Sequence, residues 1–355
     1  MKTSISRELS PDLRREWEAL WRANPHLATA FNSPVWLCAA KVAFKPKDVR
    51  IITIREEDNT LVGVCALTGD TVYGLRVFTS PVRQFADKPS ILLDWTNVQA
   101  VKALTIAFKS IGTIYLSYCR EEIAKALQKA APTVVFQDDE NAIVEFKDGY
   151  RGDLSRDSYN KILKRIKKSK EPVTMRFSKS SHDALLKDVY AVEKISTKGE
   201  RGMAEFNSLA VRTFFEALAI DQPELVRISI LDIGARPVAY SIDLLAHGIY
   251  QGSQKAYVKG YEYYQPGKYM VLKLLEHNYT EGYQAFDFGR GYDNFKIQFT
   301  KTVRPVYSVV AGNQAAGLYL KNARAARQKI YESVVRNKAL YKTFKGVKQV
   351  LKQQP

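Results

Sequence analysis

One acidic residue, Asp287, lies between two aromatic residues in the strand-like run AFDFG. If Phe286 and Phe288 face a core, the alternation of side chains along a strand directs the carboxylate to the opposite side. A buried carboxylate needs a partner, and Arg290 and Lys296 follow closely enough to form an ion pair with it. The same carboxylate could instead act as a general base that removes a proton from an attacking amine. The sequence leaves both interpretations open.

Direct transfer of an acyl group to that amine would require few further groups. Tyr292 could protonate a departing thiolate, and a backbone N–H of a central strand could stabilise the oxyanion of a tetrahedral intermediate. Holding the amine and a thioester together supplies proximity, so no covalent nucleophile is needed. Of the three cysteines, Cys65 and Cys119 lie in apolar strand-like segments, where we expect buried, inert thiols.

Polar residues also occur inside the strand-like run GIYQGSQKAYV. With regular alternation, Gln251, Ser253 and Lys255 share one face of this strand. Polar side chains are unusual inside a central strand, and a cofactor arm or an acceptor on that face would explain them. The alternative is a hairpin face that is open to water. We take Gln251 and Ser253 as candidate cofactor-binding residues.

The segment Gln265-Pro266-Gly267-Lys268 lies between a predicted strand and a predicted helix. The free N–H groups and the dipole of a helix start can hold a pyrophosphate. Gly267 would allow the phosphate to approach closely, Lys268 would add a positive charge, and Gln265 completes the candidate loop. The alternative is that Pro-Gly simply begins a helix.

The net charge of +17 is concentrated in two segments. Residues 161–170, KILKRIKKSK, place several basic side chains on one helical face, which could contact coenzyme phosphates or remain solvated. The segment 321–352 combines many lysines and arginines with apolar residues at helical spacing. This pattern predicts a basic amphipathic helix that lies on an anionic membrane, docks a partner, or packs on its own domain.

Composition excludes several classes of protein. Hydrophobic residues make up 46% of the 355 residues and charged residues 26%, which indicates a packed globular chain, most simply with two domains. The charged start is not typical of a secretory signal and no bilayer-length apolar run follows, so we expect a cytoplasmic protein. The cysteines and the four scattered histidines lack ligand spacing, so we expect no metal site.

Helical and strand-like periods alternate along both halves of the chain. Helices are expected at 11–22 and 33–43, followed by β-rich runs and further alternating elements that end near Gly149. The second half reads as helices, three strands, a loop, a helix, a strand, a short helix around YDNFKIQF and a last strand. The fold class predicted is mixed α/β, in an element order typical of a GNAT-type acyltransferase domain.

Several segments together resemble the acetyltransferase family associated with bacterial cellulose and exopolysaccharide clusters, whose relatives include the FemABX-type peptidoglycan aminoacyl transferases. These segments are FNSPVWL, SYNKILKRIKKSK, RPVAYSIDLL, IYQGSQKAY, YYQPGKYMVLKLLEH and FDFGRGYDNFKIQF. In the last of these the family pattern is Gly-x-Glu-x-Tyr-Lys. This chain instead has Asp293 at the position of the Glu and Phe295 at that of the Tyr, which shortens a carboxylate and removes a hydroxyl.

The resemblance implies two tandem GNAT-like domains with acyl-CoA, such as acetyl-CoA, as co-substrate and no metal. Residues 1–150 would form a platform or bind the acceptor, residues 151–315 would carry the acyl-CoA site, and residues 316–355 would form the basic helical tail. The implied reaction is acyl transfer to an amine, in exopolysaccharide or cell-envelope biosynthesis. Asp287, Tyr292 and Asp293 are the catalytic candidates, and Arg290 and Lys296 are added to the cofactor-binding candidates.

Two other functions remain open. One is FemABX-like aminoacyl transfer from charged tRNA, which the positive charge suits, although the sequence has no recognisable RNA-binding module. The other is a non-catalytic scaffold that binds a partner or the inner face of an anionic membrane through the basic tail.

Overall fold

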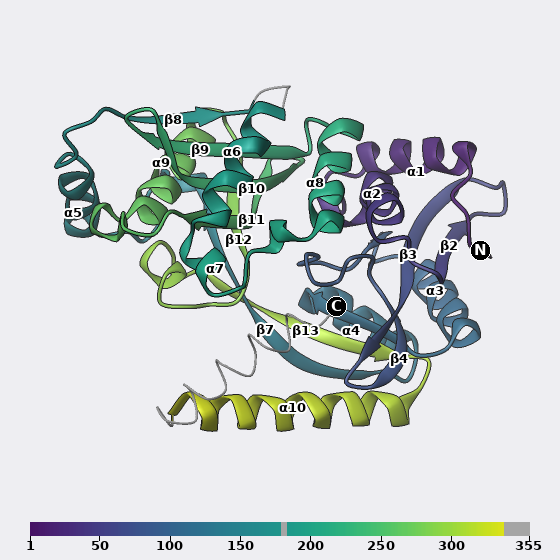
Figure 1. Cartoon of the computed structure of the whole chain (residues 1–355). Coiled ribbons are helices and arrows are strands. Elements are labelled where there is room, and N and C mark those ends of the chain that lie inside the picture. Colours follow the sequence, from purple (N-terminus) through teal and green to yellow (C-terminus); the bar gives the residue numbers. More distant parts are fainter. Residues whose placement is uncertain (179–182, 337–355) are drawn as a thin grey trace.

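The computed structural model describes residues 1–178 and 183–336, and in this part thirteen strands form one twisted sheet (Figure 1). The first part of the chain contributes β1 (Lys2–Ser6), α1 (Pro11–Ala23), η1 (Ala30–Asn32), α2 (Pro34–Phe44), β2 (Val49–Arg55), β3 (Leu61–Val72), β4 (Leu75–Thr79), β5 (Ile91–Leu93), α3 (Val98–Ile111), β6 (Ile114–Cys119), α4 (Glu121–Ala130) and β7 (Val134–Glu145). The sheet runs in the order β1-β2-β3-β4-β6-β13-β7-β12-β11-β10-β9-β8, with β5 paired to β3.

The second part of the chain supplies the remaining elements. They are η2 (Phe146–Asp148), α5 (Arg156–Ile166), β8 (Val173–Phe177), α6 (Asp183–Lys194), α7 (Thr197–Glu200), η3 (Glu205–Asn207), α8 (Leu209–Asp221), β9 (Val226–Ile233), β10 (Arg236–Ala246), β11 (Ile249–Tyr257), η4 (Glu262–Tyr264), α9 (Pro266–Thr280), β12 (Ala285–Arg290), η5 (Lys296–Gln298), β13 (Val303–Ala311) and α10 (Gln314–Arg336). The mixed α/β class predicted from the sequence is confirmed.

Local sequence signals determine several element boundaries. Helix α2 begins at Pro34, and the Ser33 hydroxyl accepts a hydrogen bond from the Trp36 N–H at 3.3 Å, as expected for an N-cap. The short helix predicted around YDNFKIQF forms as the 3-10 helix η5, which is limited to three residues. Asp293 begins this turn by accepting hydrogen bonds from the N–H groups of Phe295 and Lys296.

The two halves of the sheet exchange strands. The long strand β7 pairs with β13 on one side and extends past it to pair with β12 of the second half. The last strand, β13, returns to the first half and pairs with β6. Figure 1 shows β7 and β13 side by side, joining the two ends of the sheet. The domain boundaries expected at residues 150 and 315 stay predictions.

Apolar packing joins the halves on one face of the sheet. A single core cluster contains residues of α1 and α2 together with residues of α6, α8 and β10. At its centre, the Trp36 and Phe214 rings meet edge to face, with centroids 4.8 Å apart. On the opposite face of the second half, α5 and α9 pack over β10, β11 and β12. The second-half strands are therefore buried on both faces, which explains their long apolar runs.

Helix α10 lies along β13 and β7 (Figure 1). Ala316 and Leu320 are buried against the sheet, and Arg324 forms a 2.6 Å ion pair with Asp138. The part of the predicted basic amphipathic segment, 321–352, that follows residue 336 lies outside the described residues. Within the described residues, no helix is both long enough and apolar enough to cross a bilayer.

Candidate active site

The sheet opens between β11 and β12. These parallel strands pair at only three positions, the last of which joins Gln251 to Asp287. Beyond that point β11 continues to Tyr257, whereas β12 turns towards β7, where Arg290 pairs with Asn141. Among the described residues, β11 therefore has no paired strand on its β12 side after Gln251.

A bulge at Ser253 changes which side chains share a face. On β10, Ile242 pairs with Gln254 and Asp243 pairs with Gly252, which leaves Ser253 as the extra residue. The expectation that Gln251, Ser253 and Lys255 share one face was therefore wrong, because a bulge reverses the alternation. Gln251 faces the first half of the chain, whereas the Lys255 ammonium donates to the fully buried Asp243 carboxylate at 2.6 Å.

Asp287 forms a buried ion pair across the two halves. Lys88, on the loop after β4, donates to one carboxylate oxygen at 2.9 Å, and the Gly289 N–H donates to the other at 2.8 Å. The Asp287 side chain is only 3% exposed. Burial tends to raise the pKa of Asp287, but the Lys88 charge and these hydrogen bonds outweigh it and hold the pKa below its ordinary value. The partners expected from the sequence, Arg290 and Lys296, bind elsewhere.

A second carboxylate, Asp87, lies beside Asp287 and was missed from the sequence. It contacts the Gln251 amide at 3.5 Å and the Arg290 backbone N–H at 3.4 Å. Burial raises the pKa of Asp87, only partly offset by Arg290, while the Asp287 charge raises it further. Neighbouring carboxylates whose pKa values shift in opposite directions are typical of an acid–base site. The pair Asp87-Lys88 ahead of an apolar strand was the only signal in the sequence.

Gly289 allows Asp87 to reach the open end of the sheet. Its φ is +71°, a conformation that glycine adopts without strain. A Cβ at this position would lie 2.3 Å from the Asp87 carboxylate and 3.2 Å from the Gly252 carbonyl oxygen. The carboxylate therefore sits directly against the backbone of β12, beside the bulged part of β11.

The other residues predicted around β12 have partners within the protein. The Arg290 guanidinium donates to the Tyr118 hydroxyl at 3.0 Å and to the Gln84 carbonyl oxygen at 2.6 Å, linking β12 to the first half. The Lys296 ammonium donates to the carbonyl oxygens of Gly289 and Arg290, and its burial lowers its pKa. The Tyr292 hydroxyl donates to the Thr300 carbonyl oxygen at 3.4 Å.

The start of α9 forms the second part of the candidate site. Gln265 has a left-handed backbone conformation, and its carbonyl oxygen accepts hydrogen bonds from the N–H groups of Lys268 and Tyr269. The Gly267 N–H has no hydrogen-bond partner among the described residues. Around Gly267 the nearest atom to an added Cβ would be 3.7 Å away, in the Tyr257 ring. The helix start thus offers a free N–H and open space at the end of β11.

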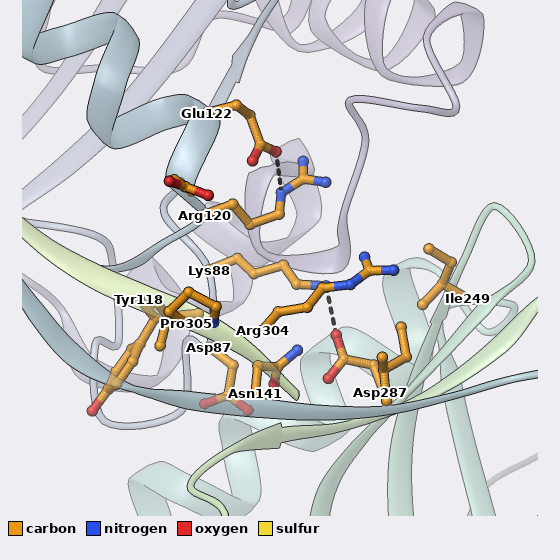
Figure 2. Close-up of a pocket in the computed structure, with 13 residues that line it drawn as sticks. Asp87, Lys88, Tyr118, Arg120, Glu122, Asn141, Ile249, Asp287, Arg304 and Pro305 are labelled. Carbon is orange, nitrogen blue, oxygen red and sulfur yellow. Dashed lines mark hydrogen bonds and ion pairs between the residues drawn. The ribbon is translucent and has the colours of Figure 1, made fainter. Parts of the chain in front are cut away.

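A cavity of about 240 Å³ reaches Asp287 from the side of the first half (Figure 2). Figure 2 shows Lys88 directed at Asp287, with Asp87 and Asn141 beside them. The cavity is lined by Asp87, Lys88, Tyr118, Arg120, Glu121, Glu122, Asn141, Ile143, Ile249, Asp287, Arg304, Pro305 and Val306. Among the described residues, no group of three or more His, Cys, Asp or Glu side chains could hold a metal ion.

Comparison with known proteins supports the same fold. Residues 156–297 match the family model described as an acetyltransferase (GNAT) domain. No curated protein matches the sequence significantly. The solved structure of FemX superposes with a TM-score of 0.64 at 12% identity, covering 90% of this chain and 100% of that chain. L-PGS from Bacillus licheniformis superposes with a TM-score of 0.59 at 15% identity, covering 90% and 98%. The chain therefore has the fold of a GNAT-domain acetyltransferase, extended as in FemX.

Proposed function

We propose that this protein is an N-acyltransferase that transfers acetyl, or another acyl group, from acyl-CoA to an amine. The observation that carries this proposal is the opening of the sheet after Gln251 and Asp287, directly beside the start of α9. A linear donor can pair with the free edge of β11 in this opening while its diphosphate reaches the helix start. The match of residues 156–297 to a GNAT domain supports the same class of reaction.

The donor would be held at both ends of this opening. The Gly267 N–H and the Lys268 ammonium would bind the diphosphate, and Gln265 would shape the turn. The arm of the donor would then run along β11 past Ser253 towards Gln251. The ends of β12 and η5, with Arg290 and Lys296, would form the opposite wall. A backbone N–H beside the bulge would face the thioester oxygen.

Two carboxylates at the end of the opening suit the proton transfer that the reaction requires. The amine nitrogen attacks the thioester carbonyl carbon, and the tetrahedral intermediate expels the thiolate after the nitrogen has lost a proton. We assign that proton to Asp87, because its raised pKa makes it the stronger base of the pair. Asp287, predicted from the sequence as the base, would hold Lys88 in place, and Tyr292 and Asp293 would order the turn after β12. Tyr292 remains the candidate donor of a proton to the thiolate.

The acceptor would approach through the cavity beside Asp287 and Lys88. Its walls carry charges of both signs, so an amine that also bears acidic groups suits it. A sugar amine in exopolysaccharide or cell-envelope biosynthesis is the acceptor that the family resemblance implies. Aminoacyl transfer from charged tRNA is the second candidate, favoured by the basic face of α5 and by the FemX-like fold.

Calorimetric titration with acetyl-CoA tests the proposal. Gly267→Asp places a carboxylate where the diphosphate should bind, whereas Gly267→Asn has a similar size without the charge. The side chain has room at this position, and an acidic residue in the first turn suits the helix dipole, so both variants should fold. We expect micromolar binding to the wild type, lost in Gly267→Asp and largely kept in Gly267→Asn. No binding to the wild type would reject acyl-CoA as the donor.

A further inference from the structure

We propose that the C-terminal end of α5 and the following turn form a subsite for the 3′-phosphate of coenzyme A, with Lys168 as the residue that contacts it. This inference rests on the proposed function, since it adds a second phosphate contact to the same donor. It would make the enzyme select coenzyme A over dephospho-coenzyme A.

The position of α5 is set by its apolar side. Ile162 and Ile166 are buried in the core cluster that also contains Met270 and Leu274 of α9. This packing turns the opposite, basic side of α5 outwards. The end of the helix lies against η4, the turn that leads directly into α9.

Lys168 joins this basic side to the donor loop. Its ammonium donates a hydrogen bond to the Tyr263 hydroxyl at 2.9 Å and lies 5.6 Å from the centre of the Tyr263 ring. Tyr263 is 52% exposed and stands two residues before Gln265, at which the diphosphate loop begins. The Lys168 ammonium is therefore held at η4, the turn that leads into the helix start at Gly267.

The basic residues of this segment are available for an anionic ligand. Among the described residues, none of the following forms an ion pair: Lys161, Lys164, Arg165, Lys167, Lys168 and Lys170. The nearby carboxylate of Glu262 instead accepts a hydrogen bond from the Gly260 N–H at 2.9 Å. Positive charges therefore outnumber the Glu262 carboxylate beside the donor loop, which raises the local concentration of phosphate ligands.

Coenzyme A has the matching chemistry. Besides its diphosphate it carries a phosphate monoester on the ribose, with a charge of about −1.5 to −2 at pH 7 if it titrates like other phosphate monoesters. A lysine ammonium binds such a group as a point charge and with several donor hydrogens. The ring of Tyr263 would direct the Lys168 side chain towards the donor, and the lysines of α5 would add to the field.

Titration of coenzyme A and dephospho-coenzyme A, side by side, tests the subsite. We expect the wild type to bind coenzyme A at least about tenfold more tightly. Lys168→Gln should lose about tenfold in affinity for coenzyme A and none for dephospho-coenzyme A. Lys109→Gln, which removes an exposed lysine from the end of α3 in the first half, should bind both as the wild type does.

The failures of the two proposals are distinguishable. Equal binding of both coenzymes by the wild type would overturn the 3′-phosphate subsite and leave the acyl-CoA site standing. Equal losses for both coenzymes in Lys168→Gln would also overturn it, because the lysine would then serve the shared diphosphate. Binding of neither coenzyme, with salt-sensitive binding of charged tRNA that Lys168→Gln weakens, would assign α5 to RNA and reject both proposals.

Discussion

Lys88, on the loop between β4 and β5, and Asp287, on β12, form an ion pair at 2.9 Å. Asp287 has almost no exposed surface and Lys88 is 15% exposed, so each charge depends on the other. Both side chains also line the cavity. The ion pair therefore affects both the stability of the contact between the two halves and the charge at the candidate site.

Lys88→Gln should destabilise the protein by about 3 kcal/mol at pH 7, because it leaves a buried carboxylate without its counter-charge. The free energy of unfolding in denaturant measures this loss. The pKa of Asp287 is lowered in the folded state, so its stabilisation is present above the ordinary aspartate pKa and is lost as the pH falls through the folded value. The difference between wild type and variant should therefore shrink below about pH 4.

The double variant Lys88→Gln with Asp287→Asn is the matched control, since it removes both charges. It should recover most of the stability lost in the single variant. Additive losses in the double variant would show that the two side chains do not stabilise each other.

Asp87→Asn should lower kcat by about a hundredfold or more, because it removes the proposed general base. In the wild type, activity should rise with pH through the folded pKa of Asp87, which lies above the ordinary aspartate value. The pH profile of kcat/KM, compared with that of the variant, measures this limb. An unchanged kcat in Asp87→Asn would contradict the assignment.

The same substitution should raise the free energy of unfolding at pH 7. A carboxyl whose pKa is raised by folding binds its proton more tightly in the folded state, so its contribution to stability declines as the pH rises above the unfolded value. Asn removes that cost. Thermal unfolding at pH 7 and pH 4 should show a gain that is larger at pH 7, whereas a loss of stability at pH 7 would indicate that pairing with Arg290 dominates.

Gly289→Ala should lower kcat strongly, whereas it should lower the free energy of unfolding only modestly. The new Cβ would displace the Asp87 carboxylate, and the left-handed backbone adds about 1 kcal/mol of strain. Gly282→Ala is the control, because Gly282 also has a left-handed φ of +78° but an added Cβ meets nothing within 4 Å. Steady-state kinetics should show a loss of kcat in Gly289→Ala alone. Equal kcat values in the two variants would show that Gly289 is not needed to position Asp87.

Local signals in the sequence predicted much of the framework. Ser33 and Pro34 marked the start of α2, and Pro266 marked the start of α9. The aromatic neighbours of Asp287 placed its carboxylate on the correct face of β12, because a regular strand alternates.

Features that depend on distant contacts could not be predicted. Asp87 meets Gln251 across a separation of 164 residues, and no local pattern marks such a contact. The bulge at Ser253 reverses the alternation of side chains along β11, and no sequence signal predicts the position of this bulge. The pairing of β13 with β6 and β7 of the first half likewise could not be predicted, because the residues of β13 indicate a strand but not its neighbours.

A crystal structure of the protein with acetyl-CoA would be the most direct test of the proposed acyl-CoA site. We expect the diphosphate at the Gly267 N–H, the donor arm against β11 beyond Gln251, and the thioester near Asp87. Acetyl-CoA bound elsewhere, with the space between β11 and β12 closed by side chains, would contradict the proposed acyl-CoA site.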